Sequence, residues 1–504
     1  MVLFSNKNKI QKKQATGKDS SSIPISPSLD NNIRIVKQLL NESDDLKEQD
    51  IQLPSKQAKL LYIETITDTS VIQEQILSPI QHHSDHASVD IFPSREMNKR
   101  TDLHEVASDL LHGRTALILE NERFIYTFDT KSQYLRSIEE PNNEKVIRGA
   151  HYGFIENVNV NINLIRSRIA NKNLVIKNFM IGDEVKTKVS IVFMKNIVNP
   201  KLVSEVETRL QSIHMDIVTS PGYIEEFIED SPFSPFPQML TTQRPDRVAY
   251  NLMEGRVAIL SEGSPNALIL PITFFGFFQS PDDYNSRWYV GSFYRLLRFI
   301  SFVMAITLPA IYISIVAFHF EVLPTKMLKP IKESIELIPY PPLIEATIME
   351  LTIELIREAG VRLPSSIGPV IGIVGGLVIG QAAVEAHLVS NIMVIIVAIT
   401  AIASFVVPSN EMVTTLRLLR FPLMIVAASF GFLGIILGLT VMLMHMCTLQ
   451  SFGTPYLAPI SVGRWTDFKD TWIRVPIWKM NRRPKDPQPQ QLDRESDSRR
   501  WKKE

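Results

Sequence analysis

Long apolar runs in the second half of the chain constrain the fold more than any other feature. Residues 299–318 carry no charge, and three further apolar runs cover 367–387, 389–407 and 421–447. A helix of about 20 apolar residues is long enough to cross the hydrocarbon core of a bilayer. The sequence therefore predicts an all-α polytopic membrane domain over 286–447, with four spanning helices.

The residues beside these runs predict the orientation. An aromatic cluster with two arginines precedes the first run: Trp288, Tyr289, Phe293, Tyr294, Arg295 and Arg298. Such clusters lie at membrane interfaces, and arginines favour the cytoplasmic side. The N-terminus lacks an apolar core of signal-peptide length, so we expect the N-terminal half to stay in the cytoplasm. Four spans return the polar, basic tail 448–504 to the same side.

An amphipathic helix is expected over 343–359, between the first two runs. Glu350, Glu354 and Glu358 lie one turn apart on it, and like charges at this spacing destabilise an isolated helix. Two interpretations stay open. The carboxylates either pair with Arg357 and Arg362 on an interfacial helix, or line a pore or vestibule in an oligomer and favour cations.

Glycine recurs at every fourth position of the second run, at Gly368, Gly372, Gly376 and Gly380. Small residues at this spacing let helix backbones approach closely within lipid. The row predicts a helix-packing seam, with 367–407 forming a helical hairpin in which Ser390 caps the second helix. Glu385, at the predicted cytoplasmic end of the first helix, either reaches water at the interface or lies at a pore mouth.

The N-terminal half contains an internal repeat. "VASDLLHGRTALIL" (106–119) aligns without a gap with "VAYNLMEGRVAIL" (248–260), and each reads as a short helix, a glycine stop and a buried strand. We therefore expect two repeated cytoplasmic α/β subdomains, at 29–140 and 180–285. The repeated Gly-Arg pair is expected to cap the helix rather than to bind phosphate.

The segments around the two subdomains are polar. Residues 1–28 are rich in Lys and Ser, so we expect them to be disordered. Residues 141–179 are expected to link the subdomains. Three arginines of this linker, Arg148, Arg166 and Arg168, could bind an anion, but we expect them instead to form salt bridges at the interface between the subdomains.

Composition and motifs exclude several classes of function. Lys+Arg and Asp+Glu both number 53, which gives no reason to expect a nucleic-acid partner. The single cysteine, Cys447, rules out an intramolecular disulfide framework and a multi-cysteine zinc site. Nothing resembles a P-loop, a nucleophile elbow or an HExxH motif. We expect no enzymatic activity, metal or cofactor.

Several motifs in order resemble a known family. They are "RPDRVAYNLMEGRVAIL", "FFQSPDDYNSRW", "IELIREAGVRLPSSIGPVIGIVGGLVIGQAAVEA" and "SFGTPYLAPIS". Together they resemble the A subunit of the spore germinant receptors, the GerA family, from about residue 29 to 462.

The resemblance implies a nutrient receptor in the inner membrane of a bacterial endospore, with the N-terminal domain and the tail on the spore-core side. It implies two partners, a transporter-like B subunit and a lipoprotein C subunit. It also implies that the A subunit forms a homo-oligomer that acts as a nutrient-gated ion channel. The alternative is a non-conducting scaffold or signalling subunit that packs against the transporter-like partner.

Overall fold

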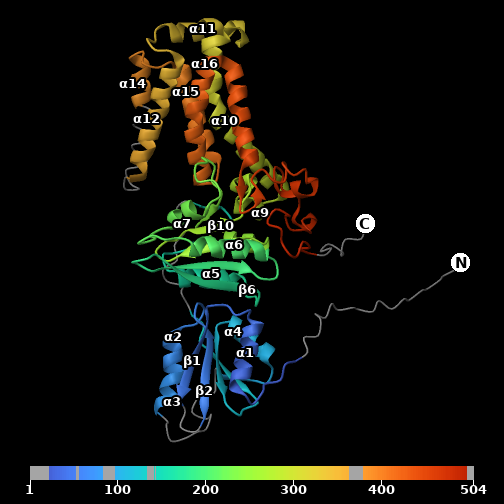
Figure 1. The fold of residues 1–504 in the computed structure, drawn as a ribbon. Helices are drawn as coiled ribbons and strands as arrows, with labels where there is room; N and C mark the ends of the chain where they lie inside the picture. The colour runs from blue at the N-terminus through green and yellow to red at the C-terminus, as the bar shows by residue number, and fades with distance from the viewer. Residues whose placement is uncertain are drawn as a thin grey trace, which may run out of the picture. The chain divides into compact units, whose positions relative to one another are not determined.

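The computed structural model describes residues 22–52, 56–82, 97–132, 141, 144–362 and 378–495 (Figure 1). The chain divides into two compact units. The first consists of residues 1–133 with 170–175, and the second contains the rest of the chain. An α/β N-terminal region is followed by a helical bundle and a folded tail.

The first subdomain is a five-stranded antiparallel sheet with helices on its faces. Its strands are β1 (Leu46–Gln52), β2 (Gln57–Ile63), β3 (Met97–Arg100), β4 (Arg114–Leu119) and β5 (Ile125–Asp129), in the order β1-β2-β4-β5-β3. Its helices are α1 (Leu29–Leu39), α2 (Thr69–Ile72), a π-helical turn (Gln73–Leu77), α3 (Ser78–His82) and α4 (Leu103–Leu111).

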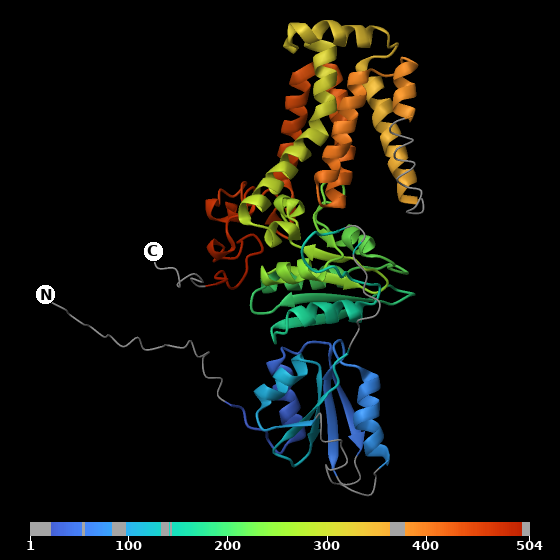
Figure 2. The same ribbon diagram turned by 180° about the vertical axis from the view of Figure 1, so that it is seen from behind.

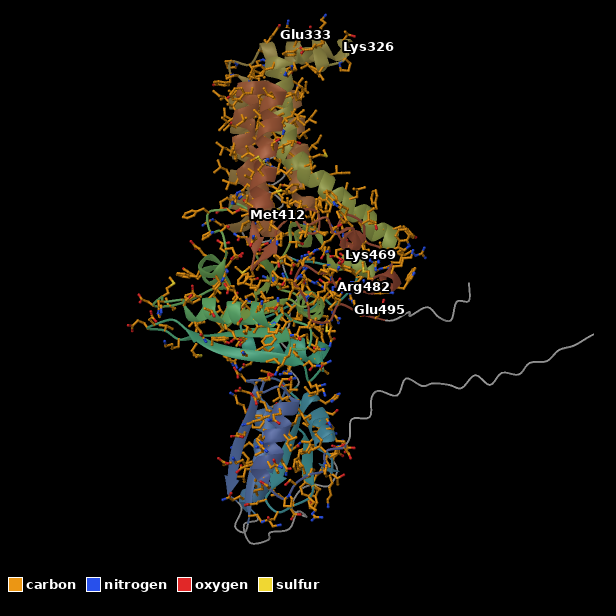
Figure 3. The ribbon with its side chains drawn as sticks, turned by 45° about the vertical axis from the view of Figure 1, so that its right-hand side comes forward. Lys326, Glu333, Met412, Lys469, Arg482 and Glu495 are labelled. Atoms are coloured by element: carbon orange, nitrogen blue, oxygen red, sulfur yellow. The ribbon has the colours of Figure 1, made fainter. Side chains whose placement is uncertain are left out.

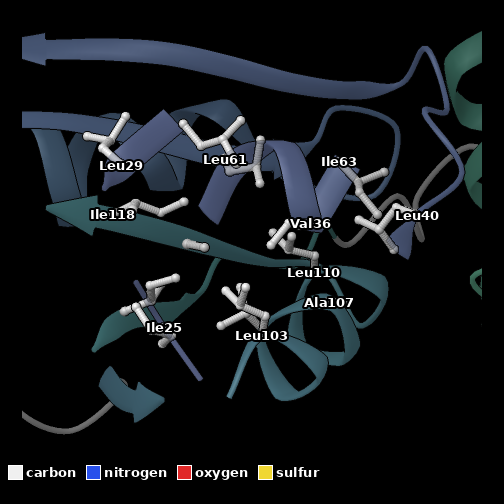
Figure 4. Packing of buried hydrophobic residues seen from close by; sticks show 14 of the residues in the cluster. Ile25, Leu29, Val36, Leu40, Leu61, Ile63, Leu103, Ala107, Leu110 and Ile118 are labelled. Atoms are coloured by element: carbon white, nitrogen blue, oxygen red, sulfur yellow. The ribbon is translucent and has the colours of Figure 1, made fainter. Parts of the chain in front are cut away.

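The core of this subdomain forms because the apolar side chains of α1 and α4 meet alternate residues of the central strands. Val36 and Leu110 pack with Leu61 and Ile118, and all four are almost fully buried (Figure 4). A second cluster, which includes Leu60, covers the other face of the sheet beneath the π-helical turn. Because side chains alternate along a strand, each central strand contributes to both clusters.

The second subdomain repeats this topology. Its strands are β6 (Leu174–Ile181), β7 (Thr187–Met194), β8 (Leu240–Thr242), β9 (Val257–Ser261) and β10 (Ala267–Leu270), in the order β6-β7-β9-β10-β8. Its helices are α5 (Val158–Arg168), α6 (Pro200–Gln211), α7 (Pro221–Ile228) and α8 (Pro245–Met253). Strand for strand, the order is that of the first sheet.

The aligned Gly-Arg pairs occupy equivalent places in the two subdomains. Gly113 follows α4 with φ +86°, and Gly255 follows α8 with φ +94°. A side chain other than hydrogen is strained in this left-handed conformation, which commonly ends helices. The predicted role as a helix cap leading into a strand is therefore confirmed at both positions.

Two expected boundaries differ from the structure. Residues 141–179, expected as a linker, contribute α5 and most of β6 to the second subdomain. Asn157 caps α5 by accepting hydrogen bonds from the backbone N–H groups of Asn159 and Val160, a helix start that the polar composition of the segment concealed. Residues 22–28, expected to be disordered, are ordered in part, because Ile25 is buried in the first core. Residues 1–21 lie outside the described residues.

The helical bundle follows a 3-10 helix (Phe274–Phe278) and the short helix α9 (Pro281–Asn285). It contains α10 (Trp288–Phe318), α11 (Thr325–Glu336), α12 (Pro342–Arg362), α14 (Gly380–Glu385), α15 (Asn391–Val406) and α16 (Asn410–Thr448). We call the end of the bundle where α10 begins the basal end, and the end crossed by α11 the distal end (Figures 1 and 2).

Within the described part of the chain, α10 and α16 are long and apolar enough to cross a membrane, and α15 is a shorter apolar helix. Helix α16 does not run straight. Gly431 has φ +62° and ψ −142°, and the chain turns back there. Thr415 and His445, from the two halves of α16, therefore both reach the loop after α7, where they bond Pro235 and Ser234.

The bundle differs from the expected four spans in two ways. The predicted span 421–447 contains the reversal at Gly431, so it contributes to two antiparallel helices. The amphipathic helix expected at 343–359 extends over α12 and runs inside the bundle, because its Glu345 and Glu350 are buried against neighbouring helices. Of the span expected at 367–387, residues 367–377 lie outside the described residues.

The tail, expected as a polar and basic segment over 448–504, is folded up to Glu495, the last residue that the structure describes. It forms a two-stranded hairpin, β11 (Gln450–Ser451) with β12 (Thr454–Pro455), and two 3-10 turns (Trp465–Asp470 and Ile477–Lys479). It packs on the second subdomain, where Arg483 Nε donates to the Met253 carbonyl at 2.6 Å. Figure 3 shows Lys469 and Arg482 of this tail near the start of α10.

Candidate functional site

A buried ion pair connects α12 and α16 inside the bundle. The Glu350 carboxylate accepts a hydrogen bond from Arg420 Nη1, and each side chain is 1% exposed. Arg420 Nε also donates to the Ala305 carbonyl of α10 at 2.9 Å. Removing charges from water is costly, and a pair offsets that cost only with good geometry and further hydrogen bonds. This pair therefore connects three helices.

A second buried carboxylate lies nearer the distal end. Glu345 Oε1 accepts from the backbone N–H of Ser390 at 2.5 Å, and the Ser390 hydroxyl lies 3.0 Å from the Tyr312 hydroxyl. Ser390 Oγ in turn accepts from the Met393 N–H, so it is the N-cap of α15 as predicted. The carboxylate thereby ties the start of α15 to α10 and α12.

Toward the basal end the charges become more accessible. Glu354 lies 3.1 Å from Arg357 on its own helix and 3.7 Å from Arg417 on α16. The Arg357 guanidinium also stacks over the Phe405 ring, 5.0 Å from its centroid. One more turn along α12, Glu358 pairs with Arg362 at 2.5 Å in a largely exposed position. The acidic row thus runs from the interior of the bundle to its basal surface.

The charges of this arrangement balance, but some of its polar atoms have no hydrogen-bond partner. We call Glu345, Glu350, Glu354, Arg357, Arg417 and Arg420 the bundle cluster. Its three carboxylates match its three guanidinium groups. Five of its described polar atoms are buried without a hydrogen-bond partner: Glu350 Oε1, Arg357 Nε and Nη2, Arg417 Nε and Arg420 Nη2. Glu354 lies within 4 Å of Arg357 on its own helix and of Arg417 on α16, so its charge is compensated from both helices.

The acidic row of α12 was predicted from the sequence, but two of the four arginines that pair with it were not. Arg357 and Arg362 pair as one interpretation required, whereas Arg417 and Arg420 of α16 were not considered. A signal for them existed. These two arginines lie three residues apart just before the run at 421, and Glu350 and Glu354 are four apart, so the two pairs match across antiparallel helices.

Glu385 lies apart from the cluster. It is exposed on α14 and accepts a hydrogen bond from Gln381 at 3.1 Å. It was expected at the cytoplasmic end of its helix, but α14 lies at the distal end of the bundle with the Ser390 cap (Figure 1). The reason for the difference is α12, which adds a pass through the bundle before Glu385.

The glycine row is described only at its last member. Gly368, Gly372 and Gly376 lie outside the described residues. Gly380 is buried, but an added Cβ would lie 3.9 Å from Val394, an ordinary contact. Close backbone approach at Gly380 is therefore not required, and the packing seam remains a prediction for the other three positions.

The three arginines of the 141–179 segment do not form one site. Arg148 is exposed, and its backbone N–H donates to Asp282 at 3.2 Å. Arg166 is 3% exposed on α5. The Arg168 guanidinium lies 4.9 Å from the centroid of the Tyr152 ring. The salt bridges expected for them at the subdomain interface remain a prediction.

A second charged cluster, at the basal end of α10, was not predicted. Fully buried Asp283 pairs with Arg298 at 2.7 Å and with Arg295 at 3.3 Å. Arg295 also donates to the Asp470 carboxylate of the tail at 2.8 Å. The Tyr284 hydroxyl donates to Asp470 at 2.7 Å, and burial, followed by this neighbouring carboxylate, raises the pKa of Tyr284. We call Asp283, Tyr284, Arg295, Arg298 and Asp470 the basal cluster.

The basal cluster requires close packing of α9 on α10. A Cβ at Gly291 would lie 2.6 Å from the Asp283 carbonyl oxygen, so only glycine fits there. Within the described ranges, no group of three or more His, Cys, Asp or Glu side chains is placed to hold a metal ion. The two clusters therefore join helices, subdomain and tail through ion pairs.

Comparisons with known proteins give the family. The family described as Bacillus/Clostridium GerA spore germination protein matches residues 34–486. The chain is 42% identical to spore germination protein B1 of Bacillus subtilis (strain 168), over 91% of this chain and 97% of that protein. It is 37% identical to spore germination protein GerLA of Bacillus cereus, over 89% of this chain and 93% of that protein.

A solved structure is also similar. It is the N-terminal domain of the A subunit of the Bacillus megaterium spore germinant receptor GerK3. The match has 26% identity and a TM-score of 0.40, and it covers 50% of this chain and 98% of that one. From the family match over residues 34–486 and from the two relatives at 42% and 37% identity, the chain belongs to the GerA family of spore germination proteins.

Proposed function

We propose that the chain is the A subunit of a nutrient receptor of the endospore inner membrane, and that its helical bundle conducts ions when the subunits oligomerise. The observation that carries the proposal is the bundle cluster. Ionisable side chains at membrane depth are costly and characteristically mark ion or proton pathways. Here they connect α12 and α16 from the interior to the basal surface, with Glu354 27% exposed at the accessible end.

The membrane topology is part of this proposal. Helix α10 and the first half of α16 run toward the distal end, whereas α12, α15 and the second half of α16 run toward the basal end. Ala305 and Tyr312 of α10 lie level with Glu350 and Glu345 of α12, so these two helices are antiparallel. Because α12 ends at the basal end and α14 lies at the distal end, the chain makes a further pass between them. We propose that these five helices and the predicted span 367–387 cross the bilayer, six passes in all, with the α/β subdomains and the tail on the spore-core side.

The partners in this proposal are a transporter-like B subunit and a lipoprotein C subunit. They are supported by membership of the GerA family, for whose A subunits these two partners are expected. The second candidate function is a non-conducting scaffold or signalling subunit. Neutralisation of Glu350, Glu354 and Glu358 by arginines favours it, because a fully paired carboxylate attracts cations weakly.

Conductance of the purified full chain in planar bilayers, alone and with the B and C subunits, tests the two functions. If Glu354 lines a conduit, Glu354→Gln leaves a net positive charge from Arg357 and Arg417, and cation selectivity decreases. Glu358→Gln is the matched control on the same helix, because its carboxylate is exposed and paired only locally. The scaffold function predicts no conductance under any condition, and a conductance that Glu354→Gln leaves unchanged would remove Glu354 from the pathway.

A further inference from the structure

The tail returns to the basal end of the bundle as an amphipathic strap. We define the strap as residues 471–479, "TWIRVPIWK". Thr471 and Arg474 point inward and are 5% and 2% exposed. Three large apolar side chains face outward, with exposed fractions of 54% for Ile473, 50% for Ile477 and 42% for Trp478, and Trp472 stays 37% exposed although one side of its ring packs on α10. Folded segments of a water-soluble surface rarely expose four such side chains together.

The strap is fixed beside the first turns of α10. The Ser292 hydroxyl donates to the Arg474 carbonyl at 2.9 Å, and Arg295 Nη1 donates to the Asp470 carbonyl just before the strap at 2.7 Å. Trp472 packs on Phe299, with ring centroids 4.4 Å apart. Two of these contacts come from the backbone of the strap or its flank, so the strap follows the path of α10.

The adjoining turns of α10 expose aromatic side chains of the same kind. They are Trp288, Tyr289, Phe293 and Tyr294, with exposed fractions from 42% to 63%. Tryptophan and tyrosine gather where a membrane protein meets the lipid headgroups. Strap and helix together therefore present one aromatic surface at the level where α10 leaves the subdomain and enters the bundle.

The charges around this surface are cationic. Arg287 precedes the helix, Lys469 precedes the strap and Lys479 ends it, and all three are exposed. Asp470 before the strap and Asp283 of α9 both bind Arg295, and Asp282 of α9 accepts hydrogen bonds from the backbone N–H groups of Ile147 and Arg148. Exposed aromatic and aliphatic groups with a basic border are complementary to an anionic bilayer surface.

We propose that the strap is a second membrane anchor, which inserts Ile473, Ile477 and Trp478 among the headgroups of anionic phospholipids on the side where α10 begins. The proposal rests on the proposed membrane embedding of the bundle. Asp470 and Arg474 connect the strap to the basal cluster and to α10. A bilayer that binds the strap therefore contacts the segment that holds Arg295. Lipid charge thereby influences the position of the start of α10.

The test uses the full chain in nanodiscs, with Cys447 replaced by Ser and one new cysteine carrying an environment-sensitive fluorophore. The reporter is Ile477→Cys. The matched control is Leu492→Cys, which is 40% exposed in the same tail but outside the strap. A bilayer reporter is Ile425→Cys, 56% exposed on the first half of α16. Quenching by lipid-attached and by water-soluble quenchers is compared in phosphatidylglycerol and in phosphatidylcholine.

The 477 label is expected to be quenched from the lipid and protected from water, more strongly in phosphatidylglycerol, while the 492 label stays accessible to water in both lipids. Lys479→Glu is expected to abolish the difference between the two lipids. A 477 label as accessible as the 492 label overturns the proposal, as does protection that develops only when a partner protein is added. If the 425 label is also accessible to water, the membrane embedding itself is wrong.

Discussion

Glu350 of α12 and Arg420 of α16 form a buried ion pair, each side chain being 1% exposed. A pair of this kind is asymmetric in its energetics. Replacing both partners by apolar groups costs little or even stabilises, whereas removing one partner leaves a buried charge without compensation. Glu350 therefore differs from Glu354 and Glu358, which are more exposed, in the stability that a single substitution should cost. A substitution of Glu350 is best compared with one that also replaces Arg420.

Glu350→Gln is expected to lower the free energy of unfolding by about 3–5 kcal/mol, because Arg420 stays charged and buried. Glu350→Gln combined with Arg420→Met should recover most of this loss. Glu358→Gln, at the exposed pair with Arg362, is the control and should change stability by less than about 1 kcal/mol. Thermal unfolding of the purified variants in detergent measures the three values. Equal melting of the 350 and 358 variants would contradict the structural role of the pair.

Gly431→Ala is expected to disturb the reversal within α16. The residue has φ +62° and ψ −142°, a conformation in which a side chain costs about 1–3 kcal/mol, and an added Cβ would lie 2.9 Å from His319 Nε2. Gly360→Ala in α12 is the control, because nothing lies within 4 Å of its added Cβ and the residue is helical. Limited proteolysis of the two variants should show faster cleavage only for the first. Identical digestion would mean that the reversal tolerates a side chain.

Cysteine labelling distinguishes the proposed topology from a four-span one. In a Cys447→Ser background, Lys18→Cys and Lys485→Cys should react only from the spore-core side. Glu385→Cys should react from the opposite side, with Lys329→Cys of α11 as its companion at the distal end. Four spans without α12 would instead place residue 385 on the same side as residue 485. Membrane-impermeant maleimide applied to vesicles of known orientation provides the readout.

The contact between α7 and the start of α16 predicts a pH dependence. Burial, followed by repulsion from Glu411 and Glu229, raises the pKa of Glu225 from 4.5 to about 8. Between these two values the folded chain retains a proton that the unfolded chain releases. Stability should therefore decrease as the pH rises from about 4.5 and become constant above about 8.

Glu225→Gln is expected to flatten that profile and to stabilise the chain at pH 8, since no charge then has to be buried. Glu226→Gln, on the exposed side of the same helix, is the matched control. Melting temperatures measured from pH 5 to pH 9 compare the two variants with the unmodified chain. A slope that persists unchanged in the 225 variant would assign the pH dependence to other groups, such as Glu229, whose pKa is raised to about 7.

Local patterns predicted local structure well. The alignment of residues 106–119 with 248–260 indicated a duplicated unit, and the two sheets share one strand order. The Gly-Arg caps and the Ser390 N-cap followed from residue type and spacing, because each depends on a few neighbouring backbone groups. The acidic row of α12 was visible for the same reason.

Contacts between distant segments were not predictable in this way. Arg420 is 70 residues from Glu350, and Asp470 is 175 residues from Arg295, so no periodicity connects them. The reversal at Gly431 was hidden because an uncharged run of 27 residues, 421–447, satisfies the length rule for one span. Hydropathy measures length and polarity, whereas the direction of the chain at one glycine depends on its φ angle.

The attachment of α16 at both of its ends has a mechanical consequence. Thr415 near its start and His445 near its end bond adjacent residues of one loop, Pro235 and Ser234, while the turn at Gly431 lies against Phe318 and His319. The two halves of the helix are therefore connected at both ends. They are joined covalently through the turn at Gly431, and their other ends are hydrogen-bonded to the same loop. We therefore expect a displacement of the loop after α7 to move both halves together, and the stacking of Phe432 on His319 connects their turn to the end of α10 at the distal end of the bundle.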